Sequence, residues 1–75
     1  MDDWSRTDVR TMHFLIGAAL LYEDIRHDLL KRGRRRVLIQ RVGISARVYD
    51  FLMSIEDVGS VEELAGEVYK RLYLL

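Results

Sequence analysis

The chain has 75 residues and contains neither cysteine nor proline, which excludes disulfides and thiolate metal sites. A domain of this length buries only roughly 60% of the surface that its unfolded chain exposes, so we expect its stability as a monomer to be marginal. Apolar residues make up 49% of the chain, and this surplus predicts association with a second copy or with a partner.

The formal net charge of zero hides an uneven distribution of charge along the chain. Residues 1–30 carry a net charge of −3, residues 31–49 carry +7 without a single acid, and residues 50–75 carry −4. A basic segment between acidic flanks indicates an anionic partner at that segment. The alternative is a solvated arginine-rich segment that the acidic helices neutralise.

The longest apolar run is too short to cross a membrane. It covers residues 14–22, which is nine residues, whereas a membrane-spanning helix needs about 20. The chain begins with Met1-Asp2-Asp3-Trp4, which is acidic, whereas a secretory signal begins with basic residues. We therefore expect a soluble, cytoplasmic protein without a membrane partner.

The first predicted helix begins after Ser5, which can cap it, with Asp8 in its first turn. It is expected to run to about residue 32, with Gly33 in the left-handed position that ends it. Its middle is apolar on almost every side, which is typical of a helix buried on several sides. We infer that it packs against a second subunit. The residues expected at this dimer interface are Phe14, Ile16, Ala19, Leu20, Val37 and Ile39.

The segment that follows can be interpreted in two ways. Residues 37–42 are rich in β-branched side chains and lie between Gly33 and Gly43, which favours a strand of about six residues. A helix is the alternative, because arginine, leucine and glutamine are good helix formers. A lone strand would leave its backbone groups unpaired, so it would have to pair with the same strand of a second copy.

Two capped helices are expected in the rest of the chain. Ser45 caps the first, and Ser60 with Glu63 forms a capping box that begins the second, which ends at about residue 73. The predicted fold is mainly α, as a single domain over residues 1–75 that forms an intertwined homodimer. Residues 1–33 form the long dimerisation helix, and residues 34–75 form the basic segment and the two capped helices.

Residues 34–75 resemble the ribbon-helix-helix family of dimeric DNA-binding proteins. The likeness lies in the sequence Val-Tyr-Asp-Phe-Leu-Met-Ser-Ile at residues 48–55 and in the turn and helix of residues 59–72. The resemblance implies that two basic strands pair into a ribbon that enters the DNA major groove, and that the backbone near Ser60 holds a phosphate. The strand register stays open. One register presents Arg36, Leu38 and Gln40, and the other presents Val37, Ile39 and Arg41.

A second resemblance concerns residues 42–45, Val-Gly-Ile-Ser, which look like the turn of the helix-turn-helix family. In that family the turn consists of a glycine, an apolar residue and a capping serine that opens a recognition helix. The resemblance implies that Arg47, Tyr49 and Asp50 face the DNA groove.

The sequence carries no pattern typical of an enzyme. We find no carboxylate pair in a plausible pocket and no phosphate-binding glycine loop, and the spacing of Asp24 and His27 is a weak metal motif, so we expect no catalysis, no cofactor and no metal. The expected function is that of a small dimeric DNA-binding protein, with transcriptional regulation as a role, and the expected partners are a second copy and double-stranded DNA. The alternative is a non-enzymatic protein–protein interaction or oligomerisation module. The expected nucleic-acid contacts are Arg34, Arg35, Arg36, Gln40, Arg41, Arg47 and Ser60.

Overall fold

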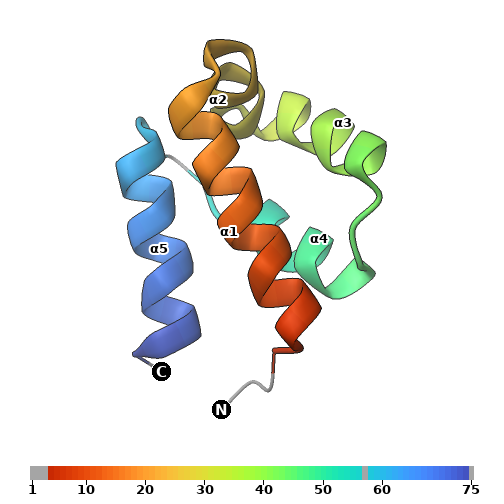
Figure 1. The fold of residues 1–75 in the computed structure, drawn as a ribbon. Coiled ribbons are helices and arrows are strands. Elements are labelled where there is room, and N and C mark those ends of the chain that lie inside the picture. The colour runs from red at the N-terminus through yellow and green to blue at the C-terminus, as the bar shows by residue number, and fades with distance from the viewer. Residues whose placement is uncertain (1–3, 57, 75) are drawn as a thin grey trace.

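The computed structural model describes residues 4–56 and 58–74, and within these residues the chain forms five helices and no strand. The mainly α prediction is therefore confirmed. In Figure 1, α1 lies between α5 on one side and α3 and α4 on the other. None of these helices is long and apolar enough to cross a membrane. The helices are α1 (Arg6–Leu21), α2 (Glu23–Leu30), α3 (Arg32–Val42), α4 (Ala46–Met53) and α5 (Val61–Tyr73).

The predicted long N-terminal helix is two helices, so the prediction of one helix to residue 32 was wrong. Tyr22 has an extended backbone (φ −121°, ψ 122°) that separates α1 from α2. The break leaves both backbone groups of Tyr22 hydrogen-bonded. The Tyr22 N–H donates to the Ala18 carbonyl (2.8 Å), and the Tyr22 carbonyl accepts from the Arg26 N–H (3.0 Å). The turn folds α2 back so that Leu29 enters the core, where it is 1% exposed.

The segment for which a strand was favoured is helix α3, so the strand and the ribbon that it implied are wrong. The helix buries Arg35 and Ile39, which are four residues apart and therefore share one face of a helix. This burial outweighs the β-propensity of the valines and isoleucine, as tertiary packing often does. Gly33 lies inside the first turn of α3, and the left-handed cap is Gly43 (φ 75°), whose N–H donates to the Ile39 carbonyl (3.0 Å).

The predicted caps of the other helices are confirmed. The Ser5 hydroxyl accepts from the Asp8 N–H (3.0 Å), and the Ser60 hydroxyl accepts from the Glu63 N–H (3.1 Å). At the Ser60 cap, the Glu63 carboxylate also accepts from the Gly59 N–H (3.1 Å). The final helix ends at Tyr73, as the sequence predicted.

The core is made by one side of α1 together with α5 and the inner faces of the three shorter helices. Met12, Leu15, Ile16 and Ala19 form the buried side of α1. At the surface, the His13 Nε2 and the Tyr73 hydroxyl share a hydrogen bond (2.8 Å) that joins α1 to α5. The remaining buried apolar residues are Leu29, Ile39, Val48, Leu52, Ile55, Val61, Leu64 and Val68.

Candidate nucleic-acid interface

Helices α3 and α4 are joined by a tight turn of three residues, Gly43, Ile44 and Ser45. Gly43 has the left-handed backbone that ends α3, and the Ser45 hydroxyl accepts from the Val48 N–H (3.2 Å) to begin α4. The same hydroxyl donates to the Asp8 carboxylate (3.0 Å), which ties the turn to α1. Gly43 therefore ends one helix and Ser45 begins the next, as the sequence of the turn predicted.

Arg35 is buried, which contradicts its predicted role as a DNA contact. Its side chain is 1% exposed, and its guanidinium donates to three backbone carbonyls. The Nε bonds the Leu29 carbonyl (2.6 Å), while Nη1 bonds the carbonyls of Leu52 (2.6 Å) and Ile55 (2.8 Å). A side chain held in this way cannot reach a phosphate, so Arg35 is a structural residue.

The carbonyls around Arg35 explain why a cation is tolerated inside so small a core. Leu29 lies in the last turn of α2 and Leu52 in the last turn of α4, where helix dipoles place partial negative charge. Burial, together with the charge of the nearby Arg32, lowers the pKa of Arg35. A guanidinium stays charged in proteins, so the carbonyls receive charge-assisted hydrogen bonds that offset the loss of water.

Three further arginines of the basic segment are held by the chain itself. Arg34 pairs with Asp28 (Nη1–Oδ1 3.2 Å). Arg32 donates to the Met53 carbonyl (2.9 Å) and lies 3.7 Å from the Glu56 carboxylate. Arg47 lies over the Trp4 ring, with its guanidinium carbon 4.3 Å from the ring centroid. These contacts show that the count of seven cations overstates the charge available to a partner.

The cations that α3 leaves available are Lys31, Arg36 and Arg41. All three are exposed, and in residues 4–56 and 58–74 none of them forms a hydrogen bond or ion pair through its side chain. Gln40 is also exposed and follows Arg36 by four residues, so the two lie on the same side of α3. The exposed side of α3 is therefore mainly basic, and its exposed large apolar side chains are Val37 (51% exposed) and Val42 (43% exposed).

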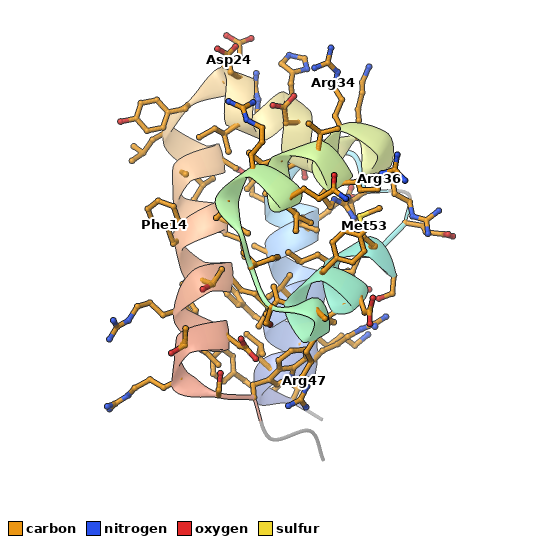
Figure 2. The ribbon with its side chains drawn as sticks, turned by 90° about the vertical axis from the view of Figure 1, so that its right-hand side faces the viewer. Phe14, Asp24, Arg34, Arg36, Arg47 and Met53 are labelled. Atoms are coloured by element: carbon orange, nitrogen blue, oxygen red, sulfur yellow. The ribbon has the colours of Figure 1, made fainter. Side chains whose placement is uncertain are left out.

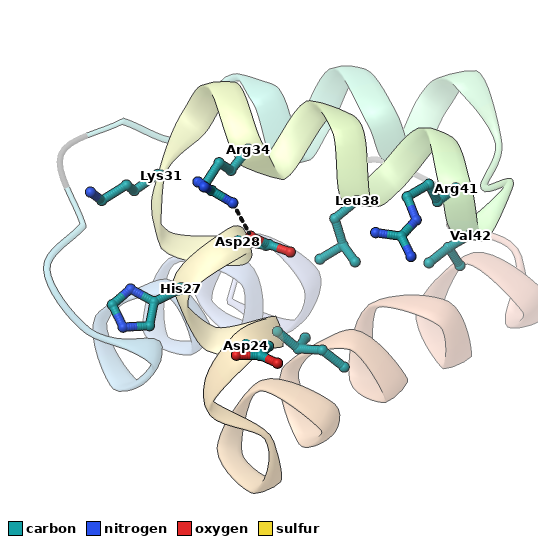
Figure 3. Close-up of a pocket in the computed structure, with 9 residues that line it drawn as sticks. Asp24, His27, Asp28, Lys31, Arg34, Leu38, Arg41 and Val42 are labelled. Carbon is teal, nitrogen blue, oxygen red and sulfur yellow. Dashed lines mark hydrogen bonds and ion pairs between the residues drawn. The ribbon is translucent and has the colours of Figure 1, made fainter.

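A half-open groove of about 830 Å³ lies between α2 and α3 (Figure 3). Acidic side chains from α2 and basic side chains from α3 line it together with apolar groups, and Arg34 pairs with Asp28 there. Asp24 and His27 of the weak metal motif are at its rim, and the described part of the chain contains no group of three histidine, cysteine or acidic residues able to hold a metal ion. The lining residues are Asp24, Ile25, His27, Asp28, Lys31, Arg34, Leu38, Arg41 and Val42.

The second helix of the turn is a poor DNA-reading surface. Arg47 packs on Trp4, Tyr49 is half-buried against the core, and the exposed Asp50 would repel phosphate. Ser60, the last predicted DNA contact, is half-buried and caps α5. The available charge is therefore on α3 and not on α4.

The six predicted dimer residues separate into two groups. Ile16, Ala19 and Ile39 lie in the core of the chain itself and are not available to a second copy. The other three are more than half exposed. They are Phe14, Leu20 and Val37.

Comparison of the chain with protein-family models, with curated proteins and with solved structures found no match.

Proposed function

We propose that the protein binds double-stranded DNA through the exposed side of α3, using Lys31, Arg36 and Arg41. The observation that carries the proposal is that these three cations make no contact with an acid among the described residues, although the chain has as many acids as bases. Acidic side chains neutralise Arg32 and Arg34 nearby. Exposed cations without an ion-pair partner attract a polyanion.

The dimensions of α3 suit a duplex. Lys31 immediately precedes α3 and Arg41 lies in its last turn, so a helix length of about 15 Å separates them. Duplex DNA carries one charge about every 1.7 Å of its axis, so the three cations can contact separate phosphates. An α-helix also fits the major groove, where Gln40 would face base edges and can pair with adenine. Regulation of transcription is the role proposed for such a contact.

Salt dependence gives the proposal a numerical test. Binding to a labelled random-sequence duplex, followed by fluorescence anisotropy, should weaken with salt as a power law. Three phosphate contacts per chain predict a slope of about −2.7 per bound chain in a plot of log affinity against log salt. A count of all seven cations of residues 31–49 would predict about −6.3, so the slope separates the two assignments.

Matched charge variants test which cations are used. Arg36→Ala/Arg41→Ala should reduce affinity at low salt and lower the slope by about two. The control, Arg6→Ala/Lys70→Ala, removes the same charge from exposed positions on α1 and α5 and should leave both quantities nearly unchanged. Equal losses in the two variants, or no binding by the unmodified protein at low salt, would rule out α3 as a DNA-binding surface. The protein-interaction module would then become the preferred function.

A further inference from the structure

The groove between α2 and α3 has two walls of opposite charge. Asp24 and Asp28 line it from α2, and Arg34 and Arg41 line it from α3. Asp28 and Arg34 neutralise each other. Asp24 and Arg41 lie farther along the two helices from the turn at Lys31, and neither forms an ion pair or side-chain hydrogen bond within residues 4–56 and 58–74. The half of the groove away from the turn therefore keeps one unpaired acid and one unpaired base.

Apolar side chains line the same half of the groove. Ile25 of α2 and Leu38 of α3 are half-buried and pack against the core, and Val42 is 43% exposed. All three line the groove, and in Figure 3 Leu38 and Val42 flank Arg41. A ligand held by the two charges would therefore also meet apolar surface.

The two walls of the groove are fixed to each other by the chain. The buried Arg35 of α3 donates to the Leu29 carbonyl in the last turn of α2 (2.6 Å), and the pair of Arg34 and Asp28 joins the same two helices at the surface. The volume of about 830 Å³ falls within the roughly 300–1,000 Å³ that is typical of small-molecule sites. A ligand would therefore enter a site that is already formed.

We propose that this half of the groove binds a zwitterionic α-amino acid with a large apolar side chain. The carboxylate of the ligand accepts hydrogen bonds from the Arg41 guanidinium, whose fork of donors matches it. The ammonium group donates to Asp24, and the side chain covers the apolar surface of Ile25, Leu38 and Val42. Asp24 repels a simple anion and Arg41 repels a simple amine, so the two walls together select a molecule that carries both charges.

Occupation of the groove removes one cation from the proposed DNA contact. Arg41 is one of the three cations assigned to DNA, whereas Arg36 is two residues from Leu38 and so lies on the opposite side of α3. Figure 2 also shows Arg36 well away from Asp24. The amino acid and DNA therefore compete for Arg41, and each should weaken the binding of the other by the same factor. This competition rests on the proposed function, whereas the amino-acid site does not.

The first experiment titrates nitrogen-15-labelled protein with L-phenylalanine, without DNA, and follows the amide chemical shifts. The changes should be concentrated in α2 and α3 around Ile25, Leu38 and Val42, with a dissociation constant of about 1 mM for so small a ligand in an open groove. Three analogues each lack one feature of the ligand: 3-phenylpropanoate lacks the ammonium group, phenethylamine lacks the carboxylate, and glycine lacks the apolar side chain. Each analogue should bind about tenfold more weakly.

The variant Asp24→Asn tests the site through its specificity. It should weaken the binding of L-phenylalanine about tenfold and strengthen the binding of 3-phenylpropanoate, because the repulsion of a lone carboxylate is removed. A loss of structure would weaken both ligands. The control Asp50→Asn makes the same change at an exposed acid of α4, outside the groove, and should alter neither affinity.

Three results would overturn the amino-acid site. They are an absence of shift changes up to the solubility limit of L-phenylalanine, shift changes that lie outside α2 and α3, and equal affinities of the unmodified protein for L-phenylalanine and 3-phenylpropanoate. The last result would show that Asp24 takes no part in binding.

The second experiment repeats the DNA titration with saturating L-phenylalanine and, as its control, with glycine at the same concentration. With Arg41 occupied, the slope of log affinity against log salt should change from about −2.7 to about −1.8 per bound chain. An unchanged slope and affinity, in a protein that binds both DNA and the amino acid, would overturn the competition. A protein that shows the expected shift changes but binds no DNA would refute the proposed function and support the amino-acid site.

Discussion

Replacing Arg35 with methionine should destabilise the protein strongly, although methionine is apolar and of similar length. The change removes three charge-assisted hydrogen bonds of 2.6, 2.6 and 2.8 Å from a side chain that is 1% exposed. A hydrogen bond to a charged group contributes about 1.5–3 kcal/mol, but methionine also removes the cost of burying a charge. We therefore expect a net loss of about 3 kcal/mol, well below the sum of the three bonds.

That loss is large for a chain of 75 residues. Small domains are stable by roughly 0.05–0.15 kcal/mol per residue, so the total here is on the order of 4–11 kcal/mol. For domains of this size, 1 kcal/mol shifts the thermal midpoint by about 4–8 °C, so the midpoint should fall by about 12–24 °C. Thermal and urea unfolding, followed by circular dichroism, measures both quantities.

Two variants make the Arg35 measurement specific. Arg35→Lys keeps the charge but has one side-chain nitrogen, which cannot donate to the Leu29 carbonyl and the two other carbonyls together. The stability of Arg35→Lys should therefore lie between those of the unmodified protein and Arg35→Met. Arg36→Ala, next in the chain but exposed, should change stability by less than about 0.5 kcal/mol. If Arg35→Met were as stable as the unmodified protein, the three bonds would contribute no net stability and our account of the buried cation would be wrong.

The turn and cap positions give two smaller predictions. Gly43→Ala should lower the free energy of unfolding by about 1–2 kcal/mol because Gly43 has a φ of 75°. Gly66→Ala, inside α5 with free space at its Cβ position, should instead raise it by about 0.8–1 kcal/mol. Urea denaturation of both variants distinguishes backbone strain from a general effect of adding a methyl group. Ser60→Ala should cost about 1 kcal/mol through loss of the bond to the Glu63 N–H while leaving DNA affinity unchanged, and a clear loss of affinity in a folded Ser60→Ala protein would return this residue to the binding site.

Local signals predicted the helices and caps where the deciding contacts are close in sequence. Ser5, Ser45 and Ser60 each cap the helix that was expected after them, because a cap depends on residues two or three positions away. The break at Tyr22 has no glycine or proline to mark it. The break places Leu29 in the core, and such a long-range contact is not visible in the sequence alone.

The basic segment shows the same limit for the candidate site. Its position and charge were clear from the sequence, but composition could not separate the exposed Arg36 from the buried Arg35 beside it. The signal that was present is the four-residue spacing of Arg35 and Ile39, which places both on the inner side once the segment is read as a helix. The β-branched residues favoured a strand, and under that interpretation the four-residue spacing did not indicate a shared buried face.

The guanidinium of Arg35, a residue of α3, donates to carbonyls at the ends of α2 and α4, so these three helices should open together. If α3 lifts away, the ends of α2 and α4 lose their charged donor in the same event. Amide hydrogens in these three helices should therefore exchange as one cooperative unit, with a shared opening free energy. The exposed cations of α3 lie on such a unit, so the DNA binding that we propose would carry little of the entropic cost that a flexible arginine-rich tail would incur.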